Sequence, residues 1–273
     1  MSFGARADTA SQTALIASQL VAARLSGTAL SAFPGPIPPT LADSYACQEA
    51  AIALWPDEVV GWKVGRIPPA LQATFNEERL AGPVFRKDLR PGVNGPVEFG
   101  VFVGGFSAVE AEFVYRLSAD APAGKLQWSE DEALALADAL FIGIETAGSP
   151  MADINEQGPL VVASDFGNNA GLILGAEIES WRGRSYESLA CETFVDGASV
   201  GRGSAASLPG GPAAALAFLL GHCAARSRPL TKGMLVSTGA ATGIHQIEAG
   251  QTARADFGDL GQITCTARPA TPA

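Results

Sequence analysis

The sequence has few of the residues and motifs that mark zinc, disulfide-rich and nucleotide-binding proteins. Its 273 residues include only two histidines, and the four cysteines lie far apart, at Cys47, Cys191, Cys223 and Cys265. Zinc sites and disulfide frameworks normally show close cysteine and histidine spacing, so we expect four reduced thiols. No GxGxxG motif follows an expected strand and no GxxxxGK[ST] motif occurs. Nucleotide binding therefore has no support.

Positive charge and long apolar runs are also scarce. The chain has 18 Lys and Arg against 28 Asp and Glu, a formal net charge of −10. Nucleic acids and anionic membrane surfaces are bound by dense Lys and Arg, so we expect neither as a partner. The longest apolar run, residues 212–220, is far shorter than the roughly 20 residues of a membrane span. No signal-peptide pattern is visible, and we expect a cytoplasmic protein.

The residues that are present predict two portions. Residues 9–25 and 41–54 carry apolar side chains at helical spacing, and the stiff connector FPGPIPP lies between them. We expect an N-terminal helical portion over residues 1–60 and a β-rich catalytic domain over residues 61–273.

Short apolar runs separated by Gly and Pro dominate the second portion. We expect strands over 59–64, 97–103, 108–117, 141–145, 160–163, 172–174, 192–195, 234–237 and 262–267. Helices are expected over 130–139, where Ser129 and Glu132 form a capping-box pattern, and over 211–225. This mixture predicts a mixed α/β fold, a largely antiparallel β-roll or sandwich with an N-terminal helical portion.

Three glutamates on the expected strands form a candidate cation site. Glu110 and Glu112 stand two residues apart in AVEAEFVYRL, so they project from one strand face while apolar residues share the other. Glu145 ends the apolar run FIGIE, where an isolated acid is costly unless it is paired or coordinates a cation. Three carboxylates fit Mg²⁺ or Mn²⁺, and an exposed strand face remains the alternative. A shared site requires all three carboxylates within about 7 Å of one another.

Lys63 is the second candidate functional residue. It lies between Trp62 and Val64 in GWKVG, a strand pattern in which a purely surface charge is unexpected. A partly desolvated ammonium here could donate or move a proton beside an anionic substrate. The alternative is a strand-edge lysine with its stem packed on Trp62.

These features resemble the 2-keto-4-pentenoate hydratase group of the fumarylacetoacetate hydrolase superfamily. The resemblance covers roughly residues 40–268, and it rests on motifs that are individually weak but occur in the family's order. They are GWKVG at 61–65, the ExE strand, the Glu145 strand, ASDFGNNAGLILG at 163–175, and a C-terminal block with STG at 237–239 and ADF at 255–257.

The resemblance implies roles for particular residues and a fumarylacetoacetase-like fold. It implies that Lys63 is the acid–base residue beside Mg²⁺ or Mn²⁺ held by Glu110, Glu112 and Glu145. It also implies that the 163–175 loop lines the substrate pocket, with Asn169 as the side-chain contact to the substrate. Thr238 and Thr242 could orient a substrate carboxylate, and a backbone cap is the alternative role for each. Asp165 is expected to stabilise a turn instead.

Two departures bear on the reaction. Many hydratases of this group carry an acid in a Pro-Asp-x-Gly segment, and Leu80 stands at that position here, while Gly82 matches. The hydrolase branch of the superfamily uses an N-terminal histidine paired with an acid, but this chain has only His222 and His245. We expect His222 to pack within an apolar helix and His245 to lie in a turn, so hydrolysis is disfavoured.

The sequence therefore predicts a Mg²⁺- or Mn²⁺-dependent hydro-lyase that is a homo-oligomer. Its substrate would be a small 2-hydroxydienoate or 2-oxo-enoate of aromatic-compound catabolism, and its product a 4-hydroxy-2-oxo acid. Two alternatives stay open: a decarboxylase of a 2-oxo-3-enedioate, and a keto-acid-binding protein with reduced catalysis.

Overall fold

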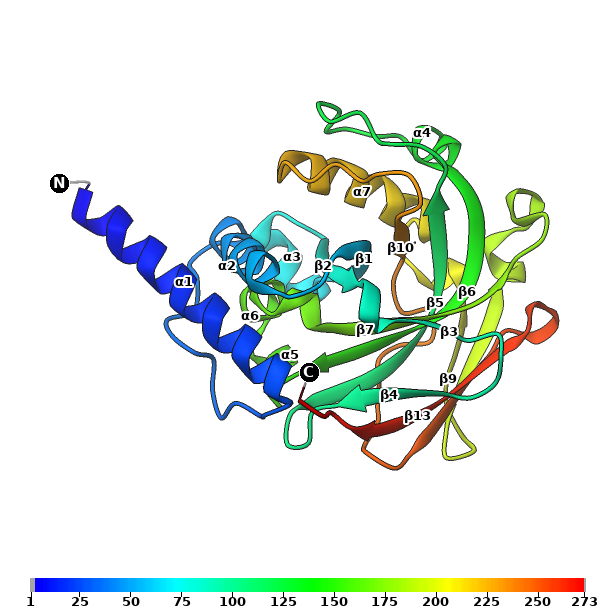
Figure 1. Cartoon of the computed structure of the whole chain (residues 1–273). Helices are drawn as coiled ribbons and strands as arrows, with labels where there is room; N and C mark the ends of the chain where they lie inside the picture. The colour runs from blue at the N-terminus through cyan, green and yellow to red at the C-terminus, as the bar shows by residue number, and fades with distance from the viewer. Residues whose placement is uncertain (1–2, 273) are drawn as a thin grey trace.

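Two helices stand beside a β-rich body in the computed structural model, which describes residues 3–272 (Figure 1). They are α1 (Phe3–Ser26) and α2 (Leu41–Leu54). The Thr40 hydroxyl caps α2 by accepting a hydrogen bond from the Asp43 backbone. Ile16 and Leu20 are buried one turn apart on α1, where they join an apolar cluster with Cys47 of α2. The N-terminal end of α1 extends away from the rest of the molecule.

The larger of two sheets carries the residues of the candidate site. Over the described residues it has eight strands in the order β2-β1-β10-β5-β6-β7-β3, with β11 paired to β5. The strands are β1 (Val59–Arg66), β2 (Arg79–Phe85), β3 (Leu89–Pro91), β5 (Phe106–Leu117), β6 (Ala137–Ser149), β7 (Asn169–Glu177), β10 (Leu235–Ser237) and β11 (His245–Gln246). Most neighbours are antiparallel, but β1 runs parallel to β10 and β3 parallel to β7.

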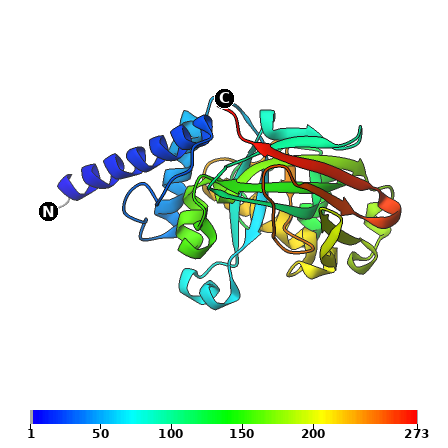
Figure 2. The same ribbon diagram turned by 90° about the horizontal axis from the view of Figure 1, so that it is seen from below.

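The smaller sheet covers one face of the larger one (Figure 2). Its five strands follow the order β4-β13-β12-β8-β9 within residues 3–272. They are β4 (Val97–Val101), β8 (Ala190–Val195), β9 (Ala198–Ser204), β12 (Thr252–Asp256) and β13 (Gln262–Pro269). Phe113 of β5 meets Phe257 across the interface, with ring centroids 5.6 Å apart. The apolar face of β5 is thereby buried, and its carboxylates are left to the opposite face.

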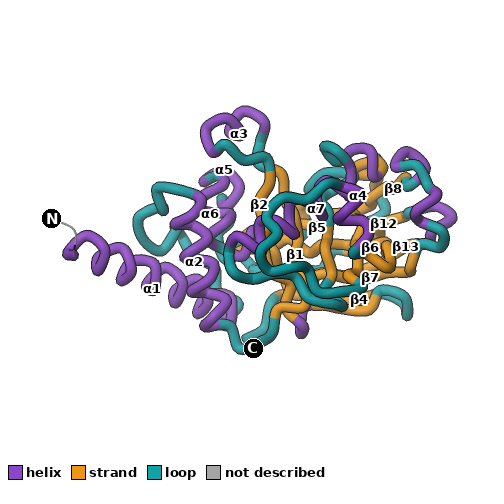
Figure 3. The backbone as a smooth tube through the Cα atoms, turned by 90° about the horizontal axis from the view of Figure 1, so that it is seen from above, coloured by secondary structure: helices purple, strands orange, loops and turns teal. Residues whose placement is uncertain are grey.

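The remaining helices lie around the larger sheet (Figure 3). They are α3 (Pro69–Phe75), α4 (Glu130–Ala135), α5 (Ile154–Gln157), α6 (Pro159–Ser164) and α7 (Gly211–Ala225). Helix α7 is apolar on nearly every side, and most of its residues are buried. Within the described part of the chain, no helix combines the length and apolar character needed to cross a membrane.

The structure confirms the mixed α/β class and corrects two elements. The strand expected over 160–163 is wrong, because these residues form α6, which starts at Pro159. Proline suits the first position of a helix, and a four-residue apolar run fits either element. The helix expected over 130–139 ends at Ala135, and β6 starts at Ala137. The capping box of Ser129 and Glu132 is confirmed.

All four cysteines are free and buried, in different parts of the molecule. Cys47 lies in α2, Cys223 in α7, and Cys191 and Cys265 in the smaller sheet. Burial raises the pKa of Cys191, Cys223 and Cys265 to about 12 each. Such thiols stay protonated at neutral pH and behave as small apolar core residues.

Candidate active site

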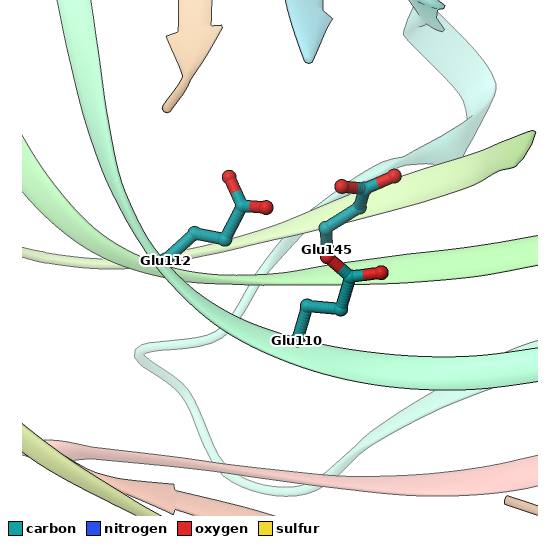
Figure 4. Close-up of side chains that lie close together, drawn as sticks. All are labelled: Glu110, Glu112 and Glu145. Carbon is teal, nitrogen blue, oxygen red and sulfur yellow. The ribbon is translucent and has the colours of Figure 1, made fainter. Parts of the chain in front are cut away.

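Strand register brings the three glutamates together. Glu110 of β5 lies directly opposite Glu145 of β6, and Glu112 follows two residues along β5. Cross-strand partners share a face, so all three side chains gather there (Figure 4). One carboxylate oxygen from each lies within 4.8 Å of the others, inside the 7 Å that a shared site requires. Glu112 and Glu145 are completely buried and Glu110 nearly so, which excludes the alternative of an exposed strand face.

Two of these carboxylates each have one bound and one unpartnered oxygen. Oε2 of Glu112 accepts hydrogen bonds from the Ser237 hydroxyl, at 2.6 Å, and the Gly239 backbone, at 2.8 Å. Oε1 of Glu145 accepts one from Nδ2 of Asn169 at 3.0 Å. The other oxygens, Oε1 of Glu112 and Oε2 of Glu145, are buried without a partner among the described residues. Buried carboxylate oxygens normally have a partner, so this pair offers two ligand atoms that a cation could bind.

Lys63 is the only cation that contacts the cluster within residues 3–272. Its Nζ lies 3.2 Å from Oε1 of Glu145, and its side chain is almost fully buried. Burial lowers the pKa of Lys63, but Glu145, Glu110 and Glu112 outweigh this effect and raise the pKa above its ordinary value. The ammonium is therefore protonated in the absence of a metal, and the alternative of a strand-edge lysine at the surface is excluded.

The charge of the cluster fits a divalent cation. Burial, followed by repulsion from Glu145, raises the pKa of Glu110 to about 8, and burial also raises the pKa of Glu112 well above its ordinary value. When all three carboxylates are ionised, they outweigh the Lys63 ammonium by two negative charges. A doubly charged cation would cancel this charge and bind the two unpartnered oxygens. An all-oxygen donor set is typical of Mg²⁺, Mn²⁺ or Ca²⁺.

A cavity of about 520 Å³ lies beside the carboxylates. Lys63, Glu110, Asn168 and Thr238 contribute polar groups to its wall, and Leu80 lines it where the acid was expected. Further apolar contacts come from Val64, Phe106, Pro159, Val162 and Leu208. A small ligand with one polar and one hydrocarbon end fits such a lining.

A left-handed turn forms part of this wall. Phe166, Gly167 and Asn168 have φ angles of 52°, 64° and 62° in succession, a conformation that a phenylalanine rarely adopts. The Phe166 carbonyl packs so closely on Gly82 that a Cβ atom there would lie 2.0 Å from its oxygen. Only glycine fits position 82, which explains the one match in the segment where the acid is missing.

An ion pair between Arg24 and Asp165 holds the turn. Nε of Arg24, near the end of α1, lies 2.5 Å from Oδ1 of Asp165. The same guanidinium donates to the carbonyls of Gly148, Asp165 and Asn169, and the Ser149 hydroxyl donates to Oδ2 of Asp165. Asp165 therefore stabilises the turn, although its main partner is an arginine side chain 141 residues away.

The expected substrate contacts are only partly gathered around the cavity. Thr238 lines it, with its hydroxyl donating to the Phe113 carbonyl. Thr242 is not among the lining residues, because it pairs with Thr193 and His245 at 2.8 and 3.1 Å. Asn169 is bound to Glu145 instead and orients that carboxylate. Its neighbour Asn168 lines the cavity in its place, which the sequence could indicate only through the NN pair.

Both histidines lie outside the cavity lining. His222 is half-buried in α7 and stacks on Phe218, with centroids 5.1 Å apart, and burial lowers its pKa to about 3. The expected turn at His245 is wrong, since this residue pairs with Val109 in strand β11. Burial lowers the pKa of His245 as well. Neither imidazole is placed to activate water in the cavity.

Comparison by sequence gives no relative. No protein-family model and no curated protein matches the chain.

Comparison of structures shows the fold. The chain is similar to 4-oxalocrotonate decarboxylase from Pseudomonas putida G7, with a TM-score of 0.77 and 21% sequence identity over 94% of this chain and 97% of that one. That enzyme was solved with calcium and acetate and with magnesium and adipate. Fumarylpyruvate hydrolase from Pseudomonas aeruginosa, with Mn²⁺ and pyruvate, gives 0.55 at 16% identity over 77% of this chain and 89% of that one. A yeast fumarylacetoacetate hydrolase family protein gives a TM-score of 0.50 and 12% sequence identity over 76% of this chain and 92% of that one.

The chain therefore has the fold of the fumarylacetoacetate hydrolase family. The resemblance noted from the sequence is confirmed at the level of the fold, and its similarity to the decarboxylase extends over nearly the whole of both chains.

Proposed function

We propose that the protein is a metal-dependent hydro-lyase that adds water to a 2-hydroxydienoate or 2-oxo-enoate and forms a 4-hydroxy-2-oxo acid. The observation that carries this proposal is the buried cluster of Glu110, Glu112, Glu145 and Lys63 beside a cavity of substrate size. Substrates of this kind arise in the breakdown of aromatic compounds, the role that the sequence resemblance implies.

The three glutamates would hold Mg²⁺ or Mn²⁺. Their unpartnered oxygens offer a hard, anionic donor set, and three protein ligands leave positions for water or for substrate oxygens. A divalent cation in this place supplies Lewis acidity, which stabilises negative charge that develops on the oxygens of a 2-oxo acid.

Lys63 would move the proton. Lys63 lines the cavity and its Nζ is held by Glu145, so it could give a proton to a substrate carbon and take it back. Asn169 fixes the other side of the Glu145 carboxylate and thereby keeps this pair in place. Hydration requires both the protonation of one alkene carbon and the attack of water on another.

Positive charge in the cavity wall favours an anionic substrate. Arg66 and Arg79 line the cavity together with Lys63, and the two arginines are direct partners across strands β1 and β2. Like charges opposite one another are unfavourable, and here Glu78, which also lines the cavity, pairs with Arg79 at 3.3 Å, while the structure gives Arg66 no ion pair within residues 3–272. In a protein with net charge −10, such a local cluster offsets the long-range repulsion of a carboxylate substrate.

Decarboxylation of a 2-oxo-3-enedioate is the second candidate. The similarity to 4-oxalocrotonate decarboxylase favours it, and the same metal and lysine would serve. Leu80 supports a third possibility, binding of a keto acid with reduced catalysis, because the cavity lacks the acid that many hydratases carry there.

A substrate panel separates these candidates. The protein is incubated with Mg²⁺ and either 2-hydroxydienoates or 2-oxo-3-enedioates, and the enol absorbance, released CO₂ and products are recorded. Loss of absorbance with formation of a 4-hydroxy-2-oxo acid supports the hydro-lyase, whereas stoichiometric CO₂ would replace it with the decarboxylase. Tight binding of oxalate with Mg²⁺, without turnover of either set of substrates, would support the keto-acid-binding protein instead.

A metal-site variant provides the control. Glu112→Gln keeps the size of the side chain but removes one charge from the cluster, so it should abolish turnover and weaken Mg²⁺ binding by more than tenfold in calorimetry. Glu98→Gln, at an exposed position of strand β4, should change neither. Undiminished Mg²⁺ affinity in Glu112→Gln would contradict the assignment of the metal site.

A further inference from the structure

Asn168 presents a buried hydrogen-bond acceptor that the protein does not use. Its side chain is 3% exposed, and Oδ1 has no partner among the described residues. Nδ2 makes one long contact, 3.4 Å, with Oδ1 of Asn155, an exposed residue that also lines the cavity. A buried amide oxygen without a donor is unfavourable, so its persistence calls for a partner supplied by the cavity.

The fold prevents Asn168 from relieving this arrangement. The Asn168 backbone donates to the Asp165 carbonyl at 2.9 Å, and Asp165 is fixed by Arg24 and Ser149. On the other side, the turn packs directly on the glycine at position 82. The left-handed conformation of residues 166–168 is thus fixed from both sides, and it is this conformation that places Asn168, rather than Asn169, in the cavity wall.

The chemistry of this oxygen differs from that of the cationic groups in the wall. Lys63, Arg66 and Arg79 donate hydrogen bonds and suit the oxygens of an acid. An amide oxygen can only accept, so it suits a hydroxyl group or a water molecule. A site that hydrogen-bonds a ligand hydroxyl discriminates strongly against the ligand that lacks it, because the buried polar group is then left unpaired.

We propose that Asn168 is a specificity-determining residue whose Oδ1 accepts a hydrogen bond from a hydroxyl group of the bound ligand, so that the cavity selects hydroxylated 2-oxo acids over unhydroxylated ones. This inference rests on the proposed function, in which the product carries such a hydroxyl. Asn168 then recognises the hydroxyl group that hydration introduces, in a cavity where Leu80 cannot do so.

Calorimetric titration tests the inference through affinity rather than turnover. With saturating Mg²⁺, the native chain is titrated with 4-hydroxy-2-oxopentanoate and with 2-oxopentanoate, which differ by the hydroxyl alone. We expect the hydroxylated acid to bind about tenfold more tightly. In Asn168→Gly the preference should fall to less than about twofold, and glycine adopts the φ of 62° without strain.

Two further variants separate the acceptor from the backbone and from the neighbouring amide. Asn168→Asp keeps an acceptor oxygen and should keep the preference, although its charge weakens binding of both acids. Asn155→Ala removes the contact to Nδ2 and should also keep the preference. Urea unfolding of each variant shows that the fold is retained.

The outcomes distinguish this inference from the proposed function. Equal affinity for both acids in the native chain, or an unchanged preference in Asn168→Gly, overturns the role of Asn168 and leaves the metal-dependent site intact. If neither acid binds with Mg²⁺ present, the proposed function fails and the inference fails with it.

Discussion

The molecule buries two clusters of charge that are built in opposite ways. Around Arg24, one guanidinium meets one carboxylate, Asp165, and the remaining donors and acceptors are bound by backbone carbonyls and the Ser149 hydroxyl. Around Lys63, one ammonium meets three carboxylates, and two of their oxygens have no partner among the described residues. Both clusters are removed from water to a similar extent.

The difference separates an ion pair whose hydrogen bonds are all made from one that is left incomplete. The Arg24 cluster is electrically balanced and saturated with hydrogen bonds, so it can only hold α1 against the turn at residues 166–168. The Lys63 cluster places three acids against one ammonium and leaves two carboxylate oxygens without a partner among the described residues, so binding of a cation would stabilise it. Burial of charge alone therefore does not indicate a functional site. Buried polar atoms that are left without hydrogen-bond partners are the better indicator.

The largest expected effect comes from removing the ammonium group of Lys63, the positive charge of the incompletely bonded cluster. Lys63→Met should lower turnover by roughly 10²–10⁴-fold, the usual contribution of acid–base catalysis, while Mg²⁺ binding is retained. Steady-state kinetics and Mg²⁺ calorimetry on the same preparation check both halves. Lys87→Met, at an exposed lysine outside the cavity lining, is the matched control. Normal turnover in Lys63→Met would mean that Lys63 only balances charge.

Removing the guanidinium group of Arg24, the positive charge of the fully bonded cluster, should lower stability instead. Arg24→Met leaves Asp165 buried without its partner, which is expected to lower the free energy of unfolding by about 3–5 kcal/mol in urea titration. Arg268→Met, which breaks an exposed pair with Glu98, should have a far smaller effect because water screens that pair. The double variant Arg24→Met/Asp165→Asn should recover part of the loss; a double variant no more stable than the single one would refute the unpaired-charge explanation.

A third experiment adds Mg²⁺ to test whether a cation stabilises the carboxylate cluster. Mg²⁺ at 100 times its dissociation constant should raise the free energy of unfolding by about 2.7 kcal/mol, since the unfolded chain offers no such site. Urea titration with and without the metal measures the increment. Glu112→Gln should abolish it, and Arg24→Met should keep it in full. An equal increment in Glu112→Gln would place the Mg²⁺ elsewhere.

The smallest effects are expected at the two histidines. His222→Gln and His245→Gln should each leave turnover within about twofold of the native chain, because neither ring lines the cavity. The assay uses the best dienoate and an acylpyruvate side by side. A hundredfold loss in His245→Gln, together with acylpyruvate cleavage by the native chain, would favour a hydrolase over the proposed lyase.

The carboxylate cluster was predictable because its geometry follows from short-range rules. Alternation along β5 places Glu110 and Glu112 on one face, and the long antiparallel pairing with β6 then sets Glu145 opposite Glu110. The mixed fold class was predictable from the spacing of apolar runs in the same way. Strand β9 was missed, however, because ASVGRGS is rich in glycine and carries no apolar alternation.

The substrate side of the site depends on long-range contacts that the sequence does not display. Whether Asn168 or Asn169 enters the cavity is set by three consecutive left-handed residues, and these are held by an arginine 141 residues earlier. Thr242 fails as a pocket residue for a similar reason, since its hydroxyl is taken by Thr193 of the smaller sheet. The motifs identified the candidate site residues, but the direction in which each side chain points depends on tertiary packing.

The four buried thiols make the chain its own probe of local opening. Cys47 reports on the N-terminal helices, Cys223 on α7, and Cys191 and Cys265 on the smaller sheet. Because burial keeps each thiol from solvent, an alkylating reagent can modify it only when its surroundings open transiently. Alkylation followed by peptide mass spectrometry would therefore give separate opening rates for these regions without any introduced label. A metal that closes the carboxylate cluster should slow some of these rates and leave others unchanged, and the pattern would trace how far the site's rigidity reaches.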